Sequence, residues 1–198
     1  MHFIEQLSKD KKLELLIKSI EAPVLVKRNH IHLRICASII SQQLNTAVAA
    51  IIYKRFEALF TKKFPTPQDI LKIPFDELRL IGLSNAKTRY VQNVCSFFIE
   101  HKVTDKLIHN MKDEELINFL IQIKGIGRWT AEMILMFTLG REDVFATDDL
   151  GIQQAMSKLY KLDELVLAEK KQKMKLLAEK WKPYRTYACL YLWSWKDS

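Results

Sequence analysis

The sequence predicts an all-α protein of about ten short helices. Apolar residues recur at helical spacing along nearly the whole chain. Residues typical of helix starts and helix ends separate these segments at short intervals. Only residues 24–34, VLVKRNHIHLR, have a strand-like composition, and a turn at Arg28-Asn29-His30 is an open alternative there.

Capping residues set the boundaries of the expected helices. Pro23 stops the first helix, and Thr66 with Pro67 has the form of an N-cap followed by an N1 proline. Gly82 and Gly140 are expected to end helices. In chain order, the expected helices span residues 3–20, 34–45, 46–64, 66–73, 74–81, 85–102, 112–123, 128–140, 149–159, 165–180 and 183–195.

Length and composition favour a globular chain with an anionic partner. The 198 residues suit one domain or two small lobes, and the net charge of +8 favours nucleic acid, with solubility alone as the alternative. No apolar run reaches the roughly 18 residues of a membrane span, and no signal peptide is apparent. We therefore expect an intracellular protein without membrane contact. Cys36, Cys95 and Cys189 are scattered, which favours buried thiols over disulfides, zinc or an iron–sulfur cluster.

Residues 123–131, IKGIGRWTA, predict a helix–hairpin–helix. One helix ends at Ile123, a Gly-x-Gly turn follows, and a new helix begins at Arg128. Gly125 and Gly127 allow a sharp reversal and leave backbone N–H groups uncovered beside a helix N-terminus, which is a phosphate-binding arrangement. Lys124 and Arg128 flank it with positive charge. A plain turn between two helices is the alternative.

A carboxylate stands 22 residues beyond Gly127. Asp149 follows Thr147 and Asp148, and all three could simply cap the next helix. The helix over residues 128–140 is about 20 Å long, so it could hold phosphate at one end and return the chain toward a cleft at the other. A fixed negative charge at a helix N-terminus suits a reaction that develops positive charge on a sugar, such as cleavage of an N-glycosidic bond.

The run IKGIGRWTAEMILMFTLGREDVFATDD strongly resembles the helix–hairpin–helix DNA glycosylases with a Gly/Pro-rich loop and a catalytic Asp (HhH-GPD). Within them it is similar to the 3-methyladenine DNA glycosylase II group. Three more blocks agree, SIISQQLNTAVAA (38–50), IGLSNAKTRYV (81–91) and WKPYRTYACLYLW (181–193). The resemblance implies two lobes with the active-site cleft between them. One lobe covers about residues 35–115, and the other combines the N-terminal helix with residues 116–198. The α/β domain that precedes the helices in larger members is expected to be absent.

The resemblance also assigns the chemistry. Asp149, rather than its neighbour Asp148, would be the catalytic carboxylate. Trp193 would pack against the flipped base, although a core position is an equal alternative. Trp129 occupies the place where strand-cutting relatives carry a nucleophilic lysine, so a monofunctional hydrolase that leaves an abasic site is implied. Met133 stands where the best-known type has a pocket aromatic.

The DNA-contacting residues are implied in the same way. A wedge would come from Gln42, Gln43 or Leu44, unless these residues form a buried helix end. Ser84 and Lys87 would reach phosphate, unless Ser84 only caps its helix. No cofactor and no catalytic metal are expected, and a structural monovalent cation at the hairpin carbonyls is allowed. The implied DNA-binding set is Lys124, Gly125, Gly127, Arg128, Thr130, Gln42, Gln43, Leu44, Ser84 and Lys87.

The resulting hypothesis is a monomeric alkylpurine DNA glycosylase that acts on double-stranded DNA containing damaged bases, in the cytoplasm at the nucleoid. A glycosylase of the same scaffold for mismatched or deaminated bases is one alternative. A non-catalytic DNA-binding module is the other, although Asp149 would only repel phosphates in such a module. The missing cysteine ligands argue against an enzyme for oxidised pyrimidines.

Overall fold

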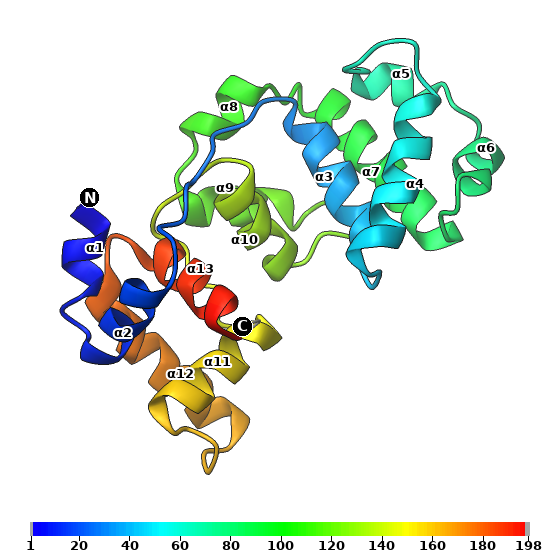
Figure 1. The fold of residues 1–198 in the computed structure, drawn as a ribbon. Coiled ribbons are helices and arrows are strands. Elements are labelled where there is room, and N and C mark those ends of the chain that lie inside the picture. The colour runs from blue at the N-terminus through cyan, green and yellow to red at the C-terminus, as the bar shows by residue number, and fades with distance from the viewer. Residues whose placement is uncertain (1, 197–198) are drawn as a thin grey trace. The chain divides into compact units, whose positions relative to one another are not determined.

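A computed structural model describes residues 2–196, and these residues form thirteen α-helices and one 3-10 helix with no β-strand (Figure 1). The predicted all-α class is therefore confirmed. None of the described helices is long and apolar enough to cross a membrane. The helices are α1 (His2–Leu7), α2 (Lys11–Ser19), α3 (Ile31–Ser41), α4 (Thr46–Ala58), α5 (Pro67–Leu71), α6 (Phe75–Leu80), α7 (Asn85–Glu100), α8 (Asp105–Asn110), α9 (Asp113–Leu120), α10 (Arg128–Phe137), α11 (Leu150–Tyr160), α12 (Leu167–Ala178), η1 (Glu179–Trp181) and α13 (Arg185–Lys196).

Two expected boundaries near the N-terminus differ from the structure. Residues 3–20 form two helices, because the Asp10 side chain accepts the N–H groups of Lys12 and Leu13 and starts α2. The ambiguous stretch over residues 24–34 forms no strand: it is irregular with a bend at Asn29, His30 has φ +57°, and α3 begins at Ile31. The start of α3 is held by the Asp105 carboxylate, which accepts the N–H groups of His30 at 2.6 Å and Ile31 at 3.1 Å. These bonds cap α3 from a residue far along the chain.

Two further boundaries were wrong at the C-terminal end of a helix. The helix expected over residues 46–64 ends at Ala58. The helix expected to reach Gly140 ends at Phe137, and Gly140 follows in the left-handed region with φ +63°. The start signals were more accurate. Thr66 and Asp69 form a complete capping box at α5, as the Thr-Pro start signal predicted.

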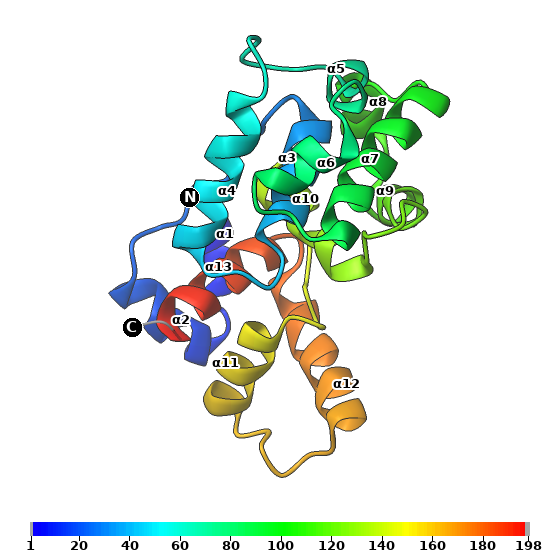
Figure 2. The same ribbon diagram turned by 90° about the vertical axis from the view of Figure 1, so that its right-hand side faces the viewer.

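The chain forms two compact units. One contains Arg28–Ile134, and the other contains the residues up to Lys27 and from Leu135 onward. In the Arg28–Ile134 unit, α7 packs against α3, α5 and α6, and α4 packs against α3 (Figure 2). Fully buried residues of α3 and α7 line this core, and they include Cys36 and Cys95.

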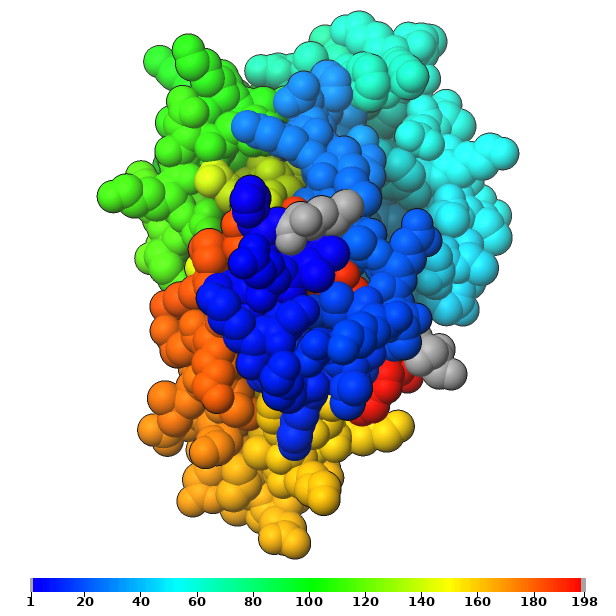
Figure 3. All heavy atoms as spheres, turned by 60° about the vertical axis from the view of Figure 1, so that its left-hand side comes forward, coloured from blue at the N-terminus to red at the C-terminus, as the bar shows by residue number. Residues whose placement is uncertain are grey.

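The second unit is built around α13. This helix packs against α2 and α11, and residues of α1 and α2 cover part of the C-terminal helices in Figure 3. The ring of Phe3 stacks on that of Tyr187 with their centroids 3.9 Å apart. The buried Trp181 donates its indole N–H to the Asp10 carboxylate. The N-terminal helices therefore complete the core that supports α11 and α13.

The boundaries of the two units differ from those of the two lobes that the resemblance implied. The sequence-based lobes met near residues 35 and 115, whereas the contact-defined units meet near residues 27 and 134. The hairpin belongs to the Arg28–Ile134 unit because Tyr90 and Asn93 of α7 and Gln42 after α3 all contact it.

Candidate active site and nucleic-acid interface

Asp149 and Trp193 form a fixed pair in the second unit. Asp149 is the N-cap of α11, and its Oδ1 atom accepts the backbone N–H of Ile152 at 2.8 Å. The same oxygen accepts the indole Nε1–H of Trp193, also at 2.8 Å. Asp149 therefore both caps α11 and bonds to Trp193, the residue that the resemblance places against the flipped base. These two contacts fix the orientation of its carboxylate.

Gly151 allows this close pairing. A Cβ atom at Gly151 would lie 3.0 Å from Asp149 Oδ1 and 3.0 Å from Trp193 Cδ1, tighter than ordinary van der Waals contact. Gly151 was not among the predicted site residues. Its position two residues after the carboxylate, in a chain with five glycines, was the available signal.

We expect Gly151→Ala to disturb the pair rather than the fold. The added methyl group pushes the indole and the carboxylate apart by a few tenths of an ångström, while alanine is favoured over glycine within a helix. The variant should therefore keep or raise its melting temperature and have a weaker indole–carboxylate contact. Near-ultraviolet circular dichroism and fluorescence of Trp193 in a variant lacking the other tryptophans would measure the second effect. An unchanged signal from Trp193 would contradict this account.

Phe137 is an aromatic neighbour that the sequence analysis missed. It lies at the end of α10, is 48% exposed, and its ring centroid is 5.7 Å from that of Trp193. Met133, the predicted pocket residue, lies one turn earlier on the same helix and is partly exposed. The aromatic contact to Trp193 thus comes from Phe137, and nothing in the local pattern distinguished it from a core phenylalanine.

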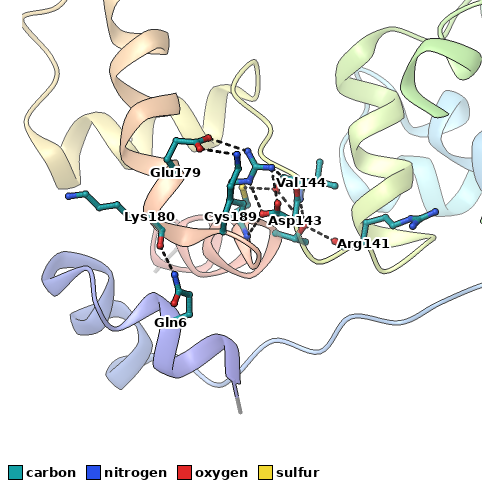
Figure 4. A network of polar contacts seen from close by, with 10 residues as sticks. Gln6, Arg141, Asp143, Val144, Glu179, Lys180 and Cys189 are labelled. Carbon is teal, nitrogen blue, oxygen red and sulfur yellow. Dashed lines mark hydrogen bonds and ion pairs between the residues drawn. The ribbon is translucent and has the colours of Figure 1, made fainter. Parts of the chain in front are cut away.

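A polar network holds the segment that leads to Asp149 against the start of α13 (Figure 4). Arg185 donates from Nε to Asp143 Oδ1 at 2.7 Å and from an Nη atom to Asp143 Oδ2 at 3.0 Å. The Thr186 hydroxyl donates to the Arg141 carbonyl and accepts the N–H of Val144. Because α13 also carries Trp193, this network fixes both partners of the Asp149–Trp193 pair relative to each other.

Asp148 has a different environment from Asp149. It is exposed, and Lys171 of α12 contacts its Oδ1 atom at 2.7 Å. The structure therefore separates the two adjacent carboxylates, since one is held by a lysine and the other by an indole and a helix N-terminus. This separation favours Asp149 as the reactive group.

The two hairpin glycines differ in role. Gly125 has φ +108°, and a Cβ atom there would lie 2.6 Å from Tyr90 Cδ1 and 2.7 Å from Tyr90 Cβ. Gly127 has no unusual φ, and a Cβ atom there would meet nothing within 4 Å. The prediction that both glycines serve the reversal holds only for Gly125. Gly127 instead keeps the surface open next to the first turn of α10, where backbone N–H groups lack acceptors within the helix.

Two side chains predicted to contact DNA at the hairpin are already engaged or buried, those of Arg128 and Thr130. Arg128 makes a bidentate ion pair with Glu114 and also contacts Glu132 at 3.1 Å. The hydrogen bond to Glu114 is the main cause of the raised pKa of Arg128. Thr130 is buried, so a DNA contact there would come from its backbone. Lys124 is exposed, and its carbonyl accepts a hydrogen bond from Asn93 Nδ2 at 3.1 Å.

The 42–44 loop, which consists of Gln42, Gln43 and Leu44, follows α3 and shares a pocket with the hairpin helix. Gln42 Nε2 donates to Gly125 O and to Thr130 Oγ1, both at 3.4 Å. Gln43 and Leu44 are exposed, and Gln43 has φ +58°. The pocket has a volume of about 360 Å³ and is lined by Ser38, Ser41, Gln42, Gln43, Leu44, Trp129 and Thr130. Of the three wedge candidates, Gln42 anchors the loop and the other two project from it.

Ser84 and Lys87 both act as caps. The Ser84 hydroxyl accepts the Lys87 N–H and starts α7. The Lys87 ammonium donates to the carbonyls of Ile40 at 2.8 Å and Gln42 at 2.6 Å. Partial burial lowers the pKa of Lys87. In the structure the Lys87 ammonium thus contacts the end of α3, and its phosphate contact stays a prediction.

With this geometry established, comparison with known proteins decides the family. Residues 36–183 match the HhH-GPD superfamily of base excision DNA repair proteins. The chain belongs to this superfamily. The hairpin, the 42–44 loop and Asp149 fall within the matched residues, whereas α13 begins at Arg185, just beyond them, and Trp193 lies ten residues beyond their end.

Individual HhH-GPD proteins agree with this assignment. The chain is 37% identical to DNA-3-methyladenine glycosylase 1 of Schizosaccharomyces pombe over 79% of this chain and 68% of that protein. The solved structure of the S. pombe 3-methyladenine DNA glycosylase in complex with abasic DNA superposes with a TM-score of 0.86 at 31% identity, covering 100% of this chain and 98% of that one. The DNA-3-methyladenine glycosidase of Bacillus halodurans gives a TM-score of 0.85 at 31% identity, covering 98% and 88%.

Other HhH-GPD relatives are longer than the matched region. The alignments span 55% of the length of two Bacillus subtilis relatives. The similarity to these proteins therefore covers the helical part that contains the hairpin and Asp149.

Proposed function

We propose that this chain is a monofunctional DNA glycosylase of base excision repair, which hydrolyses the N-glycosidic bond of alkylated purines of the 3-methyladenine type in double-stranded DNA. The observation that carries the proposal is the Asp149–Trp193 pair, in which one carboxylate oxygen accepts both a helix N–H and an indole N–H. The similarity to proteins named 3-methyladenine DNA glycosylases supports the substrate class.

The pair suits the charge that develops during this reaction. When the bond from C1′ to the purine nitrogen breaks, its electron pair leaves with the base and positive charge builds on the deoxyribose. The Asp149 carboxylate stabilises that charge, and a water oxygen then bonds to C1′ and releases a proton. Because Asp149 is already oriented by Ile152 N–H and Trp193, little reorganisation is required as the charge appears.

The aromatic residues beside Asp149 suit an alkylated purine. N-alkylation leaves a purine ring electron-poor or cationic, and such a ring is attracted to an indole face. Trp193 is partly exposed, with Phe137 half-exposed beside it. We expect the extruded base to contact these rings. An ordinary purine is a poorer leaving group than an alkylated one, so ordinary purines should be poor substrates.

Trp129 predicts that the enzyme does not cut the strand. An amine can attack the sugar and form a Schiff base, whereas an indole nitrogen cannot. Reaction on a duplex with one alkylated purine should leave the strand intact until alkali is added. Borohydride should trap no covalent protein–DNA complex. A trapped complex would contradict the monofunctional mechanism.

The proposal is tested by incubating the protein with methylated duplex DNA and identifying the released bases by chromatography. Release of free alkylated purines supports it. Release only from duplexes with mismatched or deaminated bases would replace it with a glycosylase of different specificity. Binding to these duplexes without any release would indicate a DNA-binding module.

Several expectations remain predictions. The carbonyls of Lys124 and Gly125 accept N–H groups from Asn93 and Gln42, and each keeps a second lone pair. A structural monovalent cation at the hairpin therefore fits these groups. A monomeric state and action at the nucleoid also stay predictions.

A further inference from the structure

The Lys87 side chain ends in a hydrogen-bonding arrangement at the end of α3. Its ammonium lies 2.8 Å from the Ile40 carbonyl and 2.6 Å from the Gln42 carbonyl. These carbonyls lie at the C-terminal end of α3, where a helix leaves its last acceptors without internal donors and carries partial negative charge. A lysine is a suitable cap for that end, and bonds from a charged donor are among the stronger hydrogen bonds in proteins.

The backbone that Lys87 holds is the backbone of the 42–44 loop. Gln43 has φ +58°, a conformation that residues other than glycine adopt at a cost, so it persists only where surrounding contacts hold it. The Leu44 N–H donates to Ser41 O at 3.1 Å, and Asn45 caps α4 through Val48 N–H. The contact of Lys87 with Gln42 O comes directly before the strained residue.

The side chains carried by this backbone project outward. Gln43 is exposed and Leu44 is 37% exposed, while Gln42 turns to the hairpin. Lys87 itself begins at a fixed point, because its N–H is bonded to the Ser84 hydroxyl in the first turn of α7. A rigid 16-residue helix therefore supports the loop through one side chain.

We propose that Lys87 is a positioning residue that holds the 42–44 loop in the conformation in which Gln43 and Leu44 enter the duplex. This inference rests on the proposed function, since it concerns the step in which a nucleotide leaves the base stack. Lys87 does not touch the reacting atoms. It keeps the loop ordered before the nucleotide is extruded, so it lowers the free-energy cost of opening a paired site. It leaves the hydrolytic step unchanged.

The test compares Lys87→Met, which keeps the length of the side chain but donates no hydrogen bond, with Lys87→Arg, which keeps charge and donors. Lys106→Met is the matched control. The substitution removes the same charge from an exposed lysine of α8, next in sequence to Asp105, whose carboxylate bonds the opposite end of α3. Each variant is assayed in single turnover on one alkylated purine, placed either in a fully paired duplex or in a bulge where the lesion is already unpaired.

We expect Lys87→Met to slow base release from the paired duplex by about tenfold or more, as loss of a restraint on a strained residue predicts. Release from the bulge should fall by less than about threefold, because extrusion contributes little there. Lys87→Arg should restore most of the rate, and Lys106→Met should match the native protein on both substrates. Fluorescence of 2-aminopurine next to the lesion should show reduced unstacking with Lys87→Met alone.

Two results would overturn the proposal. One is an unchanged rate of Lys87→Met on the paired duplex. The other is an equal loss on both substrates that follows a lower melting temperature, which would assign Lys87 to stability alone. If Lys87→Met does not fold, Lys87→Gln, with one donor group, decides by the same comparison. Absence of base release by the native protein on either substrate would instead refute the proposed function.

Discussion

Asp149→Asn is expected to slow base release severely while leaving the fold intact. Asparagine is as good an N-cap as aspartate, so its side-chain oxygen can still accept the N–H groups of Ile152 and Trp193. The substitution therefore removes the negative charge and little else. Loss of a group that stabilises transition-state charge lowers turnover by about a hundredfold to a thousandfold.

Asp148→Asn is the matched control for Asp149→Asn. Asp148 is exposed and its ion pair with Lys171 is a surface contact, which contributes less than about 1 kcal/mol. Single-turnover rates and melting temperatures of the two variants measure the difference. Equal activity of Asp149→Asn and the native protein would contradict the assigned role. Loss of activity in Asp148→Asn but not in Asp149→Asn would transfer that role to Asp148.

Gly125→Ala is expected to have the largest effect on stability. An alanine at φ +108° is strained, and its methyl group would overlap the ring of Tyr90. Left-handed strain and overpacking together cost at least about 2 kcal/mol. Urea denaturation should show this loss in the free energy of unfolding. Most of it should remain in a Gly125→Ala/Tyr90→Ala double variant if backbone strain dominates, and much should disappear if the clash dominates.

Gly127→Ala tests the predicted binding of phosphate at the hairpin separately from the stability of the turn. Nothing lies within 4 Å of the added methyl group, so stability should change by less than about 1 kcal/mol. The methyl group would nevertheless stand beside the N–H groups that we predict to bind phosphate. Affinity for duplex DNA, measured by fluorescence anisotropy at fixed salt, should fall about tenfold, because a hydrogen bond to a charged group contributes roughly 1.5–3 kcal/mol. Unchanged affinity would refute phosphate binding at this turn.

Local signals in the sequence predicted the parts of the structure that depend on neighbouring residues. The Thr66 capping box, the Ser84 cap and the left-handed glycine after α6 all depend on contacts within a few residues. The Asp149 cap is of the same kind. Here the structural interpretation and the catalytic one are compatible, because capping α11 is what orients the carboxylate toward Trp193.

Contacts between distant residues had no such signal. Tyr90 packs on Gly125, and Arg128 pairs with Glu114, so the basic flank of the hairpin is partly neutralised. Lys87 contacts Gln42 across 45 positions of sequence. Each of these contacts exists because helices that are separate in the chain pack together in the Arg28–Ile134 unit, and the pattern of one segment does not encode its partner.

The central claim is that the protein hydrolyses the bond between an alkylated purine and its deoxyribose, and the mass of the DNA product tests it most directly. A duplex with one alkylated purine would be incubated with the native protein and its lesion strand measured intact by mass spectrometry. We predict a strand that has lost the alkylated base and gained the oxygen and hydrogen of one water molecule at C1′, with both flanking phosphodiester bonds retained. A strand of unchanged mass, or one shortened at the lesion without added alkali, would contradict the account.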